Sequence, residues 1–183
     1  HFGFDDEALT GGQGQLPSYV SGIARVPAVY STGINVPAGA SQGVKYNYAE
    51  ASGDGHINIS MHAGTIRFWF KPDWSSASAG GTGPQNDTRL LELGRWTDQP
   101  PTAGQFWLGL SPNGDALYLV SQEAGTRVDC FNLPISFAAG EWQHIAVTYD
   151  QIQSSLYVNG ALVGQGAGLT SHPSAAELAD GLR

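Results

Sequence analysis

Short segments in which apolar and polar residues alternate make up most of the chain. The alternation is regular over four of them: 64–71, 105–111, 115–121 and 142–150. Another signal is Asn159-Gly160, a pair that favours a tight hairpin turn and that separates two apolar runs. Because side chains on a strand point to opposite faces with a period of two, this pattern predicts strands with one buried face. Helical spacing is confined to a short, weak stretch at residues 174–182.

The apolar faces of these segments form the predicted core. Its members are Ile66, Phe68, Phe70, Phe106, Leu108, Leu110, Leu117, Leu119, Ile145, Val147, Leu156 and Val158. Turns rich in Gly, Pro and Asn separate about ten or more short strands, which is typical of a sandwich or barrel. We therefore predict an all-β, two-sheet antiparallel jelly-roll sandwich with under about 10% helix. The 183 residues suit one domain, and we interpret the Ser- and Gly-rich segment 75–87 as a flexible surface loop.

Composition narrows the choice of partners. The net charge is −8, and the eight Lys and Arg residues are scattered along the sequence. Binding to nucleic acid depends on clustered basic residues, so we expect neither nucleic acid nor membrane insertion, and no membrane-spanning apolar run is present. The single cysteine, Cys130, excludes an internal disulfide and is expected to be a small buried side chain. The sequence starts at His1, and we expect an extracellular or cell-surface protein whose leader has been removed.

Three segments resemble the laminin-G-like family of concanavalin A-like jelly-roll domains. They are GTIRFWFKPDW (64–74), FAAGEWQHIAVTYD (137–150) and SSLYVNGALVGQG (154–166), and they occur in the family's order. The start, HFGFDD (1–6), is similar to the family's opening strand. The resemblance implies a laminin-G-like sandwich over residues 1–183. It leaves the function open, because the family includes adhesins, lectins, enzyme-attached modules and assembly proteins.

One departure from the family concerns the last residues of the sequence. Family members continue from the hairpin into L-[RK]-[IL]-G and then a closing strand, whereas this sequence stops at residues 180–183, where that segment would begin. We therefore expect an exposed sheet edge, which favours strand pairing and self-association. The strand at residues 2–4, a longer parent chain or a neighbouring subunit could each cover this edge.

Carbohydrate binding is the chemistry that the aromatic residues favour. Sugars are held by flat aromatic faces with planar polar groups beside them. The alternation directs Trp69 and Trp107 outward, with Arg67 and Gln105 as adjacent hydrogen-bond donors. The alternative for Trp69 is that it packs under a loop as part of the family's strand pattern. The same pattern predicts Trp142 in the core and His144 as a hydrogen-bonded structural histidine.

Calcium is the one cofactor that the sequence indicates. Asp5 and Asp6 form an acidic cluster at the start, and Asp54 lies in a Ser-Gly-Asp-Gly turn. Hard cations prefer several oxygen ligands, and the resemblance implies that an acidic residue here pairs with one from the closing strand. The alternative for each of the three is a solvated acidic turn. Asn58 and Asn86 match the glycosylation acceptor pattern, and the sequence leaves their modification open.

Catalysis is disfavoured by the spacing of the carboxylates. Glycoside hydrolysis needs two carboxylates flanking the scissile bond, and no E-x-D-x-x-E pattern occurs. We therefore predict a non-catalytic, extracellular recognition or adhesion module that binds a glycan or a surface protein. The alternatives are a structural subunit of an extracellular assembly, completed by strand exchange with neighbours, and a glycoside hydrolase.

Overall fold

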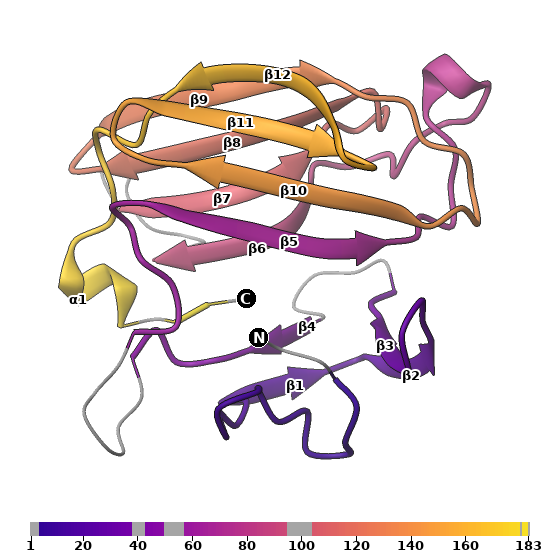
Figure 1. The fold of residues 1–183 in the computed structure, drawn as a ribbon, viewed down its shortest axis with the longest axis horizontal. Helices are drawn as coiled ribbons and strands as arrows, with labels where there is room; N and C mark the ends of the chain where they lie inside the picture. The colour runs from indigo at the N-terminus through magenta and orange to yellow at the C-terminus, as the bar shows by residue number, and fades with distance from the viewer. Residues whose placement is uncertain (1–3, 38–42, 50–56, 95–103, 180, 183) are drawn as a thin grey trace.

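Two four-stranded antiparallel sheets stack face to face and form the body of the molecule (Figure 1). The computed structural model describes residues 4–37, 43–49, 57–94, 104–179 and 181–182. The front sheet has the order β12-β11-β10-β5, with β5 (Gly64–Phe70), β10 (Gln143–Tyr149), β11 (Gln153–Val158) and β12 (Ala161–Ala167). The back sheet has the order β6-β7-β8-β9, with β6 (Thr88–Gly94), β7 (Gln105–Leu110), β8 (Ala116–Glu123) and β9 (Thr126–Pro134). This confirms the predicted all-β jelly-roll sandwich.

The N-terminal residues form two small sheets beneath the sandwich (Figure 1). In one, β1 (Tyr19–Ser21) pairs with β4 (Gly43–Lys45), and in the other β2 (Ala24–Pro27) pairs with β3 (Thr32–Asn35). The helices of the described chain are one 3₁₀ turn, η1 (Ala77–Ala79), and one short α-helix, α1 (Ala175–Leu178). Among the described residues, no helix is long and apolar enough to cross a membrane.

The core between the two sheets follows the predicted alternation. Eight predicted core side chains have no exposed surface: Phe106, Leu108, Leu110, Leu117, Leu119, Ile145, Val147 and Leu156. The other four, Ile66, Phe68, Phe70 and Val158, pack against this core but are only partly buried. Three of these lie on β5, which is an edge strand of the front sheet. The prediction of full burial was wrong there because no strand of the described chain covers the outer side of β5.

The segment at residues 75–87 is anchored, which corrects the prediction of a flexible loop. Ser76 is fully buried, and its hydroxyl donates a hydrogen bond to the carbonyl of Gly114 (2.6 Å) and accepts one from the amide of Phe137 (2.9 Å). The carbonyl of Ser76 also accepts the amide of Gly81 (2.9 Å). Trp74 packs against Gly114, where a side chain would collide with its ring. The base of the segment is therefore held by hydrogen bonds and aromatic packing to two other turns.

Leu182 links the N-terminal part to the back sheet. Leu182 forms an antiparallel bridge with Leu93 of β6 and another with Tyr46, which follows β4. The amide of Tyr46 donates to the carbonyl of Leu182 (2.8 Å), and the amide of Leu182 donates to the carbonyl of Tyr46 (2.9 Å). The edge of the back sheet at β6 is therefore partly covered from within the chain. Among the described residues, the other edge strands are β5 and β12 of the front sheet and β9 of the back sheet, and the exposed edge left by absent closing strands stays a prediction.

Candidate functional site

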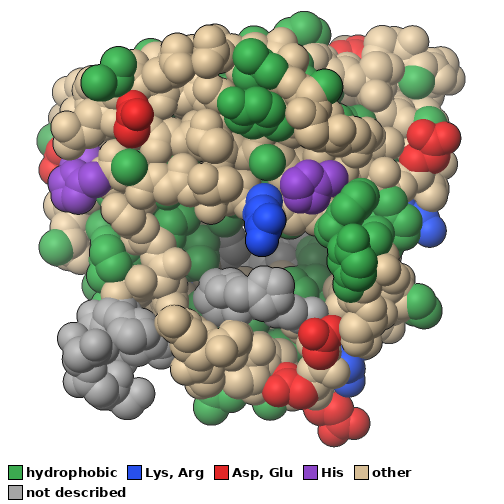
Figure 2. All heavy atoms as spheres, in the orientation of Figure 1, with side chains coloured by type: hydrophobic (Ala, Val, Ile, Leu, Met, Phe, Trp, Pro, Cys, Tyr) green, Lys and Arg blue, Asp and Glu red, His purple; other side chains and the backbone are tan. Residues whose placement is uncertain are grey.

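The outer surface of the front sheet carries a group of aromatic and polar side chains, which we call the front face. Arg67 and Trp69 point out of β5, because they alternate with the core-facing side chains of that strand. Trp69 lies opposite His144 on β10, and Arg67 lies opposite Ala146, which in turn neighbours Tyr157 on β11. Figure 2 shows a basic side chain, a histidine and a hydrophobic patch gathered over β5 and β10. The front face is thus assembled from three neighbouring strands.

Trp69 is the exposed aromatic residue of the front face, with 40% of its surface accessible. Its ring centroid lies 5.1 Å from that of His144 and 6.4 Å from that of Tyr30. Tyr30 belongs to the turn between β2 and β3 and is 75% exposed. The alternative prediction, that Trp69 packs under a loop, is therefore only partly confirmed. The β2–β3 turn contacts one edge of the ring and leaves much of the ring exposed.

The backbone of His144 is fixed by the hairpin turn that follows. Its amide donates to the side-chain oxygen of Asn159 (2.9 Å), and its carbonyl accepts the amide of Asn159 (2.8 Å). These hydrogen bonds involve the backbone of His144, and a hydrogen-bonded structural role for its imidazole stays a prediction. Its ring lies against Trp69. The side-chain amide of Asn159 also donates to Gln143 (2.7 Å), so one asparagine orients the end of the front face.

Trp142 is only partly buried and lies outside the core between the sheets, although the sequence predicts it in the core. Gln143, Ile145 and Val147 occupy the buried side of β10, so an even-numbered residue just before the strand points outward. The ammonium group of Lys71 lies 5.7 Å from the centroid of the Trp142 ring. Lys71 directly follows β5, so this cation–π pair extends the front face beyond Trp69.

The other two predicted binding residues, Gln105 and Trp107, lie on the outer surface of the back sheet. Trp107 points away from the core as predicted, but only 4% of its surface is accessible. The guanidinium carbon of Arg89 lies 4.1 Å from its ring centroid and that of Arg127 lies 5.4 Å away. The expectation that Trp107 forms an exposed binding platform was therefore wrong.

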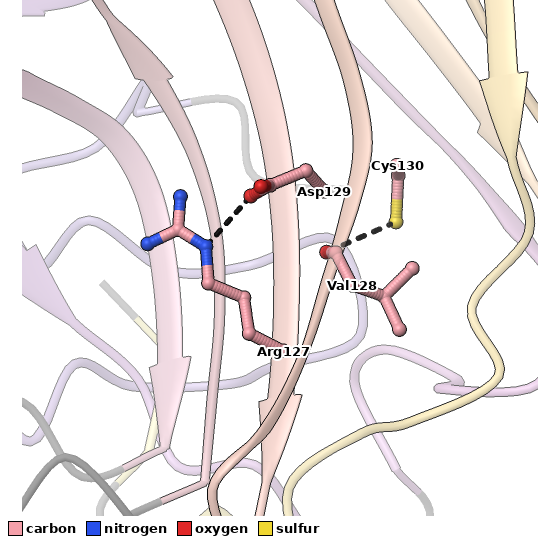
Figure 3. Close-up of polar contacts among 4 residues, drawn as sticks. All are labelled: Arg127, Val128, Asp129 and Cys130. Carbon is pink, nitrogen blue, oxygen red and sulfur yellow. Dashed lines mark hydrogen bonds and ion pairs between the residues drawn. The ribbon is translucent and has the colours of Figure 1, made fainter.

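The charged groups around Trp107 are also engaged with each other. Arg127 donates from Nε to a carboxylate oxygen of Asp129 at 2.7 Å (Figure 3). Burial is the main cause that lowers the pKa of Arg89, and neighbouring acidic groups oppose this shift. Cys130, the next residue of β9, is buried as predicted and lies 3.9 Å from the carbonyl of Val128.

The four residues predicted to bind carbohydrate therefore do not form one site. Arg67 and Trp69 lie on the front face, and Gln105 and Trp107 lie on the opposite side of the sandwich. Alternation along a strand predicts which side chains point outward, but it does not tell to which sheet a strand belongs. No local pattern in the sequence indicates the contribution of Tyr30, because its contact with Trp69 depends on how the N-terminal hairpin packs.

The acidic residues near the N-terminus cap turns. A carboxylate oxygen of Asp6 accepts the amide of Thr10 (2.7 Å), and this hydrogen bond is the main cause that lowers the pKa of Asp6. A carboxylate oxygen of Asp5 lies 3.4 Å from the amide nitrogen of Thr32. Within the described residues, no three His, Cys, Asp or Glu side chains are placed to hold a metal ion. Calcium also binds backbone carbonyl oxygens, so calcium binding at Asp5 and Asp6 stays a prediction. Asp54 lies outside the described residues, and calcium binding there stays a prediction.

Comparison with known families identifies the sandwich. A family model for the concanavalin A-like lectin/glucanases superfamily matches residues 41–181. The chain belongs to this superfamily. The matched region of this lectin/glucanase-type chain starts just before β4 and contains both sheets of the sandwich. The opening strand that the resemblance assigns to residues 1–6 lies outside the match.

Three solved structures that match this concanavalin A-like chain share little sequence with it. The binding domain of Paraclostridial Mosquitocidal Protein 1 has a TM-score of 0.61 and 16% identity, over 88% of this chain and 38% of that one. A putative carbohydrate binding protein from Bacteroides ovatus has a TM-score of 0.44 and 14% identity, over 69% of this chain and 32% of that one. Carbohydrate binding module CBM66 from Bacillus subtilis has a TM-score of 0.45 and 10% identity, over 84% and 79%. No curated protein matches the chain. The chain spans less than two fifths of the first two structures.

Proposed function

We propose that this protein is a non-catalytic, extracellular recognition module that binds carbohydrate through the front face. The observation that carries the proposal is Trp69, a half-open aromatic ring on a sheet surface between Tyr30 and His144. A flat aromatic face offers apolar contact to a sugar ring, while nearby polar groups hydrogen-bond to its hydroxyls. Arg67 is the nearest such donor on the same face of β5, two residues from Trp69.

Two further observations support binding in preference to hydrolysis. The front strands β5, β10, β11 and β12 contain no aspartate or glutamate, whereas glycoside hydrolysis requires two carboxylates at the bond that breaks. The superfamily includes both lectins and glucanases by name, and a protein of related fold is described as the binding domain of a mosquitocidal protein. The exposed Trp69 ring could therefore bind a sugar on strands that lack the carboxylates needed to hydrolyse it.

The test is binding to a panel of polysaccharides and glycans, followed by substitution of the platform residue. Trp69→Ala should weaken binding by about tenfold or more, because loss of aromatic stacking removes roughly 1–3 kcal/mol. Tyr19→Ala is a matched control, since Tyr19 is 45% exposed but lies on β1, away from the front face. Equal losses in the two variants, or no binding to any glycan, would contradict the proposal. Hydrolysis of a polysaccharide by the purified protein would contradict its non-catalytic part.

A structural subunit completed by strand exchange is a second candidate, and one observation favours it. β5 is an edge strand, and its core-facing Ile66, Phe68 and Phe70 are only partly buried. An added strand from a neighbour would pair with the backbone of β5 and cover these side chains. Sedimentation over a hundredfold range of protein concentration tests this function. Growth of ordered polymers would support it, and a monomer throughout would contradict it.

A further inference from the structure

The distribution of charge on the sandwich is uneven. The chain has 16 acidic residues and a net charge of −8, yet none of the acidic residues lies on the four front strands. The front face instead carries Arg67 within β5 and Lys71 directly after it, with Trp69 between them. The nearest acidic residues in sequence lie beyond the strand ends: Asp150 directly follows β10, and Asp73 and Glu141 lie at the Lys71 side. A locally basic strip therefore runs along one strand of an acidic protein.

The two cations of this strip, Arg67 and Lys71, are exposed, and the ammonium group of Lys71 also lies 5.7 Å from the centroid of the Trp142 ring. Within the described part of the chain neither cation forms an ion pair. The arginines of the back sheet differ, because Arg127 is paired with Asp129 and Arg89 is stacked on a buried tryptophan. An unpaired guanidinium retains its full capacity for two parallel hydrogen bonds to a carboxylate or sulfate.

We propose that the front face selects acidic glycans, meaning sugars that carry carboxylate or sulfate groups. The inference rests on the proposed function, since it places the sugar ring on Trp69. Alternate residues of a strand are about 6.7 Å apart, so Arg67 and Lys71 lie on either side of a ring stacked there. Arg67 binds the acidic group in a bidentate manner, and Lys71 adds a second positive charge. The absence of carboxylates on the four strands leaves this attraction unopposed on the sheet itself.

The experiment compares glycans that share a backbone and differ in charge. The first pair is polygalacturonate and its fully methyl-esterified form, and the second is dextran sulfate and dextran. Binding is measured by calorimetry at 50 and 300 mM NaCl. We expect at least one charged polymer to bind about tenfold more tightly than its neutral partner, with the difference reduced at high salt. The pair that shows the difference identifies carboxylate or sulfate as the group recognised.

Substitutions then locate the recognition. Arg67→Gln should remove most of the preference for the charged polymer, about tenfold, because charge-assisted hydrogen bonds are lost. Arg127→Gln makes the same change in net charge on the opposite sheet and should leave the preference intact. Equal loss in both variants would overturn the inference, as would equal binding of poly-glutamate, which carries carboxylates without sugar. Trp69-dependent binding to neutral and charged polymers alike would overturn this inference and leave the proposed function standing. No glycan binding at all would overturn both.

Discussion

Replacing Ser76 with alanine tests how the end of the sandwich is held together. The hydroxyl of Ser76 has no exposed surface and bridges two backbone groups, the carbonyl of Gly114 and the amide of Phe137. In Ser76→Ala both groups remain buried and lose this partner. An unsatisfied buried polar group costs roughly 1–3 kcal/mol, so we expect the free energy of unfolding to fall by roughly 2–6 kcal/mol for the two together.

The assay is equilibrium unfolding in urea, followed by tryptophan fluorescence and by circular dichroism, with coincident transitions as the check for two-state behaviour. Ser78→Ala is the matched control: Ser78 is exposed in the same segment, and its hydroxyl contacts only the hydroxyl of Ser136. We expect a change below about 0.5 kcal/mol for this variant. A loss below about 1 kcal/mol in Ser76→Ala, at an unchanged m-value, would refute the reasoning.

Three further predictions concern the core and the sheet edge. Phe106→Ala should lower the free energy of unfolding by about 3–5 kcal/mol, and Phe68→Ala should lower it clearly less, because Phe106 is fully buried and Phe68 is not. A urea unfolding experiment in which Phe68→Ala is the more destabilising change would contradict the observed packing. Burial is the main cause that raises the pKa of Cys130 to about 11. Its thiol should therefore resist a thiol reagent at pH 8 until the protein unfolds. Rapid labelling of the native protein would contradict this prediction. In hydrogen exchange on dilute monomer, amides of β5 should be less protected than those of β10; equal protection would remove the main support for strand exchange.

The sequence allowed the strands and most of the core to be predicted, because a period of two is a local property. It placed Leu108 and Ile145 inside and Trp69 and Arg67 outside, all as observed. It also indicated the short helix, whose Ser174 and Glu177 form a capping box that is readable from spacing alone.

The errors arose where a neighbour outside the strand decides the environment. Trp107 points outward as the alternation requires, but arginines from β6 and β9 cover its ring. Trp142 was assigned to the core from a family pattern, although its phase relative to Ile145 places it outside the core between the sheets. The residues predicted to bind carbohydrate are divided between the two sheets because the strand order places β5 and β7 in different sheets. The alternation of apolar and polar residues along a strand does not encode this order.

The bridge between Tyr46 and Leu182 has a consequence for the order in which the chain folds. During synthesis the N-terminal residues emerge first, but the segment that joins them to β6 is made after every strand of the sandwich. Contacts so distant in sequence form slowly, because a large loop must close first. We therefore expect the sandwich to fold before the N-terminal part docks, with docking as a separate late phase in refolding. Leu182→Asp should slow or abolish that phase and leave the earlier one unchanged.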